Sequence, residues 1–169
     1  MAELQVLHEQ MQHQNDRVAA IACAAWLDDM LGAAISTKFI RLGEDWKKSI
    51  FDSQGAPLST MSGKIRIGYA LGVFGPKTRA DLDKIREVRN KFAHSSGALS
   101  FNDPALSVKC MALYTSRMSH PRVSGVALGD AATPKDHYIQ SALRISGKLL
   151  MIARSGLKND RPKHPDGLP

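Results

Sequence analysis

Cysteine and aromatic residues are scarce in this chain of 169 residues, and each scarcity excludes a class of protein. The two cysteines, Cys23 and Cys110, form no CxxC pair, which argues against a disulfide-rich secreted domain. Aromatic residues make up only 6% of the chain, so we expect a core of aliphatic and alanine side chains. Such a core suits close-packed helices.

Long apolar runs are also absent. The longest extends from Val18 to Leu27, about half the length needed to cross a membrane, and it stops at Asp28. Residues Met1 to Gln5 lack the basic start and the apolar stretch of a secretion signal. Together with the low cysteine content, these features predict a cytoplasmic protein with no membrane partner.

The sequence contains no familiar catalytic or DNA-reading motif. Its six histidines are scattered and form no His-Glu-x-x-His pair, so we expect no metal site and no cofactor. No serine or cysteine nucleophile motif is present. A helix-turn-helix, a zinc finger and a basic helix with a zipper are missing as well.

Positive charge is in excess. The formal net charge of +7 favours polyanionic partners such as RNA or DNA. Part of this charge lies in residues 156–169, which we expect to form a flexible basic tail. The length predicts a single helical domain, over residues 15–155. Residues 1–14 are interpreted as an N-terminal arm, either a short leading helix or an ordered extended segment.

Apolar residues recur at helical spacing and no strand pattern appears, so we expect an all-α fold: a bundle of four main helices with short additional helices. The main helices are expected from Asp16 to Leu42, Ser59 to Phe74, Thr78 to Ser95 and Thr133 to Arg154. Shorter helices are expected over residues 44–51 and from Pro104 onward.

Several of these helices carry specific signals. Thr78 and Thr133 are expected N-caps, because each has an acidic residue three positions on, Asp81 and Asp136. The helix that begins near Asp16 is apolar nearly all round in its first half, which predicts burial at the centre of the bundle.

The most informative stretch is Arg89-Asn90-Lys91-Phe92-Ala93-His94. Arg89 falls within an apolar face that runs from Leu82 to Phe92, where a guanidinium is costly to bury without an anionic partner. His94 lies five positions on, about 140° away around the helix. Either the helix ends near Ala93 and His94 swings round, or two copies pair so that Arg89 of one faces His94 of the other. A simpler interpretation is that both are ordinary cations of a last helical turn.

Arg89-Asn90 followed by His94 resembles the Arg-x4-6-His signature of the HEPN superfamily of small helical bundles. The surrounding sequence is similar to that of the mannitol operon repressor (MltR) family: the segments are LDKIREVRNKFAHS at residues 82–95 and LSFNDP at residues 99–104. This likeness runs from about Asp16 to Arg154. It implies a HEPN-like bundle over that region.

Three functions follow. Members of the MltR family are described as repressors of operons for sugar alcohol uptake, so the resemblance implies a negative regulator of gene expression. Many HEPN branches are metal-independent endoribonucleases, which is the alternative. In that chemistry His94 would act as general base or acid, Arg89 would stabilise the phosphoryl oxygens, and Asn90 would orient one of them. In the third interpretation, Arg89 and His94 are interface residues of a dimeric protein-interaction module.

Further cations are candidates for binding nucleic acid. These are Lys91, Arg86, Arg17, Arg117 and Arg122. The MltR resemblance includes an Asp-Arg pair near Arg17. Arg117 and Arg122 lie in residues 114–132, which show no clear period and are equally well read as an exposed loop. The expected partners are a second copy of the chain, RNA or DNA, and a protein.

Overall fold

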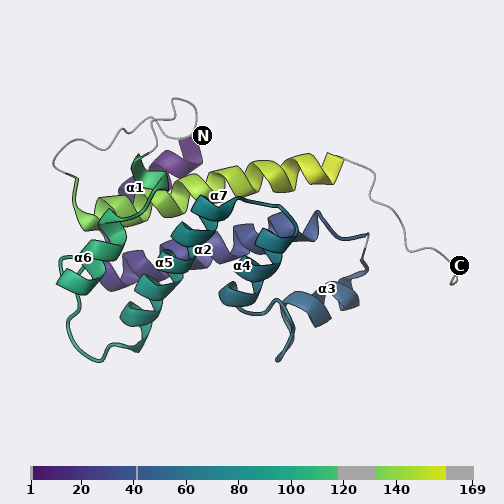
Figure 1. Ribbon diagram of the computed structural model, residues 1–169, viewed down its shortest axis with the longest axis horizontal. Helices are drawn as coiled ribbons and strands as arrows, with labels where there is room; N and C mark the ends of the chain where they lie inside the picture. Colours follow the sequence, from purple (N-terminus) through teal and green to yellow (C-terminus); the bar gives the residue numbers. More distant parts are fainter. Residues whose placement is uncertain (1, 41, 118–131, 159–169) are drawn as a thin grey trace, which may run out of the picture.

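The computed structural model describes residues 2–40, 42–117 and 132–158, and all the regular structure in these ranges is helical (Figure 1). The elements are α1 (Ala2–His13), α2 (Asp16–Ser36), α3 (Glu44–Phe51), α4 (Met61–Ala70), α5 (Pro76–His94), α6 (Pro104–Met111), the 3-10 turn η1 (Thr115–Arg117) and α7 (Pro134–Lys158). The predicted all-α class is confirmed.

Helix α2 lies at the centre of the bundle. Helix α7 runs beside it, and α4 and α5 pack on it from another side (Figure 1). The core is built chiefly from aliphatic and alanine side chains, as the composition predicts, and three aromatic rings join it. Phe92 of α5 contacts Phe101, with ring centroids 4.8 Å apart, and Phe101 contacts Tyr138 of α7 at 5.1 Å. These rings fix the C-terminal end of α5 against the bundle.

Local start signals correctly predicted where α2 and α7 begin. Asn15 caps α2, because its Oδ1 accepts a hydrogen bond from the Val18 backbone N–H at 2.9 Å. At α7, the Thr133 hydroxyl accepts from the Asp136 N–H at 3.2 Å, and Asp136 Oδ2 accepts from the Thr133 N–H at 2.7 Å. This reciprocal pair is the predicted capping box.

The cap predicted at Thr78 is wrong. Helix α5 starts earlier, with Gly75 as N-cap and Pro76 at the first position. Asp81 is fully buried and accepts hydrogen bonds from a different part of the chain: the N–H groups of Tyr114 and Thr115, at 3.0 and 2.7 Å. The carboxylate therefore satisfies the backbone before η1 instead of the start of its own helix.

Two helix ends also differ from the prediction. Helix α2 stops at Ser36, six residues before Leu42, where the Thr37 hydroxyl bonds back to the Ala34 carbonyl at 2.7 Å. Helix α7 continues through Gly156 to Lys158. A Cβ atom on Gly156 would lie 2.4 Å from Thr37 Cβ, so the glycine permits close packing instead of ending the helix. Residues 159–169, most of the expected tail, lie outside the described residues.

Residues 2–13 form the helix α1, which is one of the two structures expected for the N-terminal arm. This helix is hydrogen-bonded to the start of α7. Gln12 Nε2 donates to Asp136 Oδ1 at 2.7 Å. Lys135 Nζ donates to the carbonyl oxygens of Gln12 and Gln14, at 3.1 and 2.5 Å. The contacts tie the N-terminal segment to the C-terminal helix.

Helix α2 is less completely buried than predicted. Val18, Ile21 and Trp26 remain 42%, 37% and 39% exposed. By length and composition alone, α2 is long and apolar enough to cross a membrane. Its packing along α4, α5 and α7 accounts for that composition, as expected for a core helix.

Candidate nucleic-acid site at the end of helix α5

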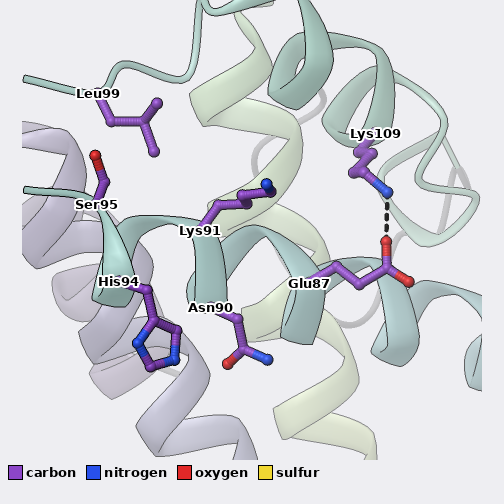
Figure 2. Close-up of a pocket in the computed structure, with 7 residues that line it drawn as sticks. All are labelled: Glu87, Asn90, Lys91, His94, Ser95, Leu99 and Lys109. Carbon is purple, nitrogen blue, oxygen red and sulfur yellow. Dashed lines mark hydrogen bonds and ion pairs between the residues drawn. The ribbon is translucent and has the colours of Figure 1, made fainter. Parts of the chain in front are cut away.

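The last turns of α5 form one wall of an open cavity of about 750 Å³. Seven residues line it: Glu87, Asn90, Lys91 and His94 from α5, Ser95 and Leu99 from the segment that follows, and Lys109 from α6 (Figure 2). We call this cavity the α5–α6 pocket. It brings together three residues predicted from the sequence, namely Asn90, Lys91 and His94.

Arg89 does not line the α5–α6 pocket, and its predicted place within the apolar face is wrong. The buried stripe of α5 includes Ile85, Val88 and Phe92, but Arg89 is exposed. Its guanidinium stays in water and avoids the cost of burial. Its Nη1 donates to Asn90 Oδ1 at 3.0 Å.

His94 does not turn toward Arg89. The last turn of α5 is regular, since the Ser95 N–H bonds to the Lys91 carbonyl at 3.0 Å, and His94 is still helical. The angle of about 140° expected from the helix geometry therefore persists. In one chain, His94 faces the α5–α6 pocket and Arg89 faces away from it, with Asn90 between them.

Lys91 and His94 are exposed, and neither side chain makes a hydrogen bond or ion pair with the described residues. Lys109 Nζ is hydrogen-bonded to Glu87 Oε2 across the cavity (Figure 2). This bond holds the pKa of the Glu87 carboxyl below its usual range. The pocket thus contains one paired and one unpaired ammonium group, an imidazole and an amide.

Arg17 lies outside the pocket but shapes its wall. Its Nη2 donates to the carbonyl oxygens of Ser95 and Gly97, at 2.5 and 3.1 Å. The neighbouring Asp16 Oδ2 accepts from the Phe101 N–H and the Ser100 hydroxyl, both at 3.0 Å. The Asp-Arg pair therefore anchors the segment that carries two pocket residues.

The other predicted cations are not gathered at the pocket. Arg86 Nε lies 3.9 Å from Asp83 Oδ1, and Arg117 Nη2 donates to the Met111 carbonyl. Arg122 lies outside the described residues. Nucleic-acid binding by Arg17, Arg86, Arg117 and Arg122 stays a prediction.

Sequence reasoning missed Glu87, Ser95, Leu99 and Lys109 as pocket residues. Glu87 had a signal, because it precedes Lys91 by four positions and His94 by seven and so shares their helix face. Lys109 had none, since only the packing of α6 on α5 brings it there.

The arrangement suits a ligand with a phosphate group. Ammonium, imidazole and amide donors can bind phosphate oxygens, and the Leu99 side chain offers an apolar surface. Within the described ranges, no group of three or more His, Cys, Asp or Glu side chains is placed to hold a metal ion.

Comparisons of the chain with models of known protein families, with curated proteins and with solved structures give no match.

Proposed function

We propose that this chain is an MltR-like negative regulator of gene expression that acts in the cytoplasm by binding nucleic acid at the α5–α6 pocket. The observation that carries the proposal is that Asn90, Lys91, His94 and Lys109 line one open cavity. Its volume of about 750 Å³ falls within the usual range for small-ligand sites, so it can accept one nucleotide of a longer strand.

Binding of this kind is chiefly electrostatic. Lys91 and Lys109 would contact backbone phosphates, which position a strand but do not read its bases. Such contacts need no helix-turn-helix. They fit the net charge of +7.

The test is binding of a labelled single-stranded RNA and of the DNA of the same sequence, followed by fluorescence anisotropy at several salt concentrations. Lys91→Ala should weaken binding and lower the slope of log affinity against log salt by about one unit. Lys48→Ala is the matched control, because Lys48 is exposed on α3, far from α6 (Figure 1). Equal effects of the two substitutions would remove the pocket from the proposal.

The second candidate function is a metal-independent endoribonuclease. The observation that favours it is the His94 imidazole, which lines the pocket beside Asn90 and makes no bond with the described residues. A base removes the proton from a ribose 2′-hydroxyl, the new 2′-O–P bond forms, and the P–O5′ bond breaks as an acid protonates O5′. Arg89 would stabilise the added charge on the phosphoryl oxygens.

This chemistry needs a second copy of the chain, because Arg89 and His94 of one copy face different directions. The exposed apolar side chains Val18 and Ile21 lie near this end of α5. They belong to the first turns of α2, as does Arg17, whose guanidinium donates to the Ser95 carbonyl. We propose a homodimer that covers them and in which Arg89 of one copy faces His94 of the other. Light scattering at micromolar concentration tests this arrangement, and a monomer would exclude the composite cleft.

Cleavage itself is tested with total RNA in EDTA. The wild type should produce new termini that the Arg89→Ala, His94→Ala double variant does not produce. Identical RNA profiles for the two proteins would eliminate the ribonuclease and leave binding as the function.

A further inference from the structure

The α5–α6 pocket contains its own anion. Glu87 is the one carboxylate among the seven lining residues, and it stands one helix turn before Lys91 on the same side of α5. Its Oε2 is bonded to Lys109 Nζ, the only contribution of α6 to the pocket (Figure 2). A ligand phosphate and Glu87 would therefore compete for the same ammonium group.

The Glu87–Lys109 pair can be exchanged at low cost. The two side chains are 46% and 38% exposed, and ion pairs at such exposed positions are weak because water screens them. A lysine ammonium is a compact charge with three donors and no fixed direction, so a small side-chain rotation moves it to another oxygen. A phosphate oxygen accepts the same kind of charge-assisted hydrogen bond.

The exchange does not require α6 to move. Leu106 and Cys110 of α6 are buried in the core and hold the helix in place. Lys109 is partly exposed and lies on the flank of α6 that borders the pocket. Only the lysine side chain has to leave Glu87.

Building on the proposed function, we propose that Glu87 is an internal competitor, which holds Lys109 until a backbone phosphate of a bound nucleic acid replaces it. In the free protein, Lys91 is then the one lysine of the pocket available to an anion. In the bound protein, Lys109 contacts the ligand and Glu87 is left facing solvent. Glu87 thereby sets the affinity of the pocket.

The first test compares Glu87→Gln with the wild type by anisotropy with the labelled RNA and DNA. The substitution frees Lys109, so affinity should rise by about fivefold with little change in the salt slope, because Lys109 contacts the bound phosphate in both forms. Glu44→Gln is the matched control: Glu44 forms a similar exposed ion pair with Lys47 on α3, away from the pocket, and has the same charge. An equal gain for both variants would overturn the proposal.

A second variant identifies Lys109 as the group released. Adding Lys109→Ala to Glu87→Gln should cancel the gain in affinity and lower the salt slope by about one unit, because one phosphate contact is lost. A gain that survives the loss of Lys109 would show that Glu87 acts only through its general charge, and the proposal would fail.

The proposal that Glu87 competes for Lys109 and the proposal that the pocket binds nucleic acid can be refuted independently. If the wild type binds RNA or DNA through Lys91 but Glu87→Gln does not bind more tightly, the function stands and the competitor is wrong. If no form of the protein binds nucleic acid, the function is wrong. Inorganic phosphate then tests the competitor alone, by carbon NMR of the Glu87 carboxyl. Loss of Lys109 to phosphate should raise the pKa of Glu87 toward its ordinary value, and an unchanged pKa would overturn the exchange.

Discussion

The two halves of helix α5 hold their polar side chains in opposite ways. In the first half, Asp81 is fully buried and accepts hydrogen bonds from two backbone N–H groups and from the Thr115 hydroxyl. In the second half, Lys91 and His94 stand in solvent without a partner among the described residues. A buried, fully satisfied group is what stability requires, whereas an exposed, unsatisfied group remains available to a ligand.

The buried polar contacts around Asp81 extend beyond α5. His137 of α7 is buried, and its Nδ1 lies 2.8 Å from Ser116 Oγ. Arg144 Nη1, on the same helix, donates to the Thr115 carbonyl at 3.1 Å. Asp81, Thr115, Ser116, His137 and Arg144 form a polar cluster that joins α5, η1 and α7. We expect it to be architectural.

The sharpest test of the comparison is Asp81→Ala, which should lower the free energy of unfolding by about 3 to 5 kcal/mol. The change leaves the buried N–H groups of Tyr114 and Thr115 without an acceptor, and it removes the carboxylate 3.6 Å from Lys84 Nζ. Urea unfolding measures the loss. Asp83→Ala, on the same helix but partly exposed, is the control and should cost less than about 1 kcal/mol. Similar losses for both would contradict the distinction.

A change of pH should have a smaller effect on the free energy of unfolding. Burial, and to a lesser degree the charge of Arg117, hold the pKa of His137 below its ordinary value. In the unfolded chain the imidazole has its ordinary pKa of about 6.5. As pH falls through that value, the unfolded state takes up the proton more readily than the native state. The free energy of unfolding should therefore fall on acidification, by at most about 1.4 kcal/mol per pH unit, and it should be unaffected well above neutrality.

His137→Gln should flatten this dependence, measured as urea unfolding between pH 5 and 8. Burial also lowers the pKa of His8, so His8→Gln should remove a second contribution of the same sign. If neither substitution changes the slope, the cluster does not hold a neutral imidazole.

The smallest effect should come from the exposed half of α5. Arg89→Ala and His94→Ala should each change the free energy of unfolding by less than about 0.5 kcal/mol, because both side chains are exposed. Thermal melts beside the binding and cleavage assays separate stability from function. A large fall in stability for both variants would make this stretch architecture and would refute the site.

Much of the fold could be predicted from the sequence because its signals are local. The cap at Asn15, the box of Thr133 and Asp136 and the proline at position 104 act within one helix turn. Helix ends were less predictable, because tertiary packing sets them. Gly156 reads as a stop signal, and only its contact with Thr37 explains why the helix continues.

The residues of the site also divide into those that local sequence signals predict and those that only tertiary packing brings together. Asn90, Lys91 and His94 share a helix and could be found by spacing alone. Lys109 joins them only through the packing of α6 on α5. The exposure of Arg89 could not be predicted either, because helical periodicity places it within the apolar stripe without showing whether another helix covers that part of the stripe.

The hydrogen bonds that Asp16 and Arg17 make to residues 95–101 bear on the order in which the protein folds. Each contact joins positions about 80 residues apart, such as the Arg17 guanidinium and the Ser95 carbonyl. Contacts of such sequence separation form late, because a long loop of chain must close first. During synthesis, the start of α2 waits for residue 101 to emerge before it can close the wall of the pocket. A fragment that begins after Arg17 could form α5 but would lack the contacts that hold this wall.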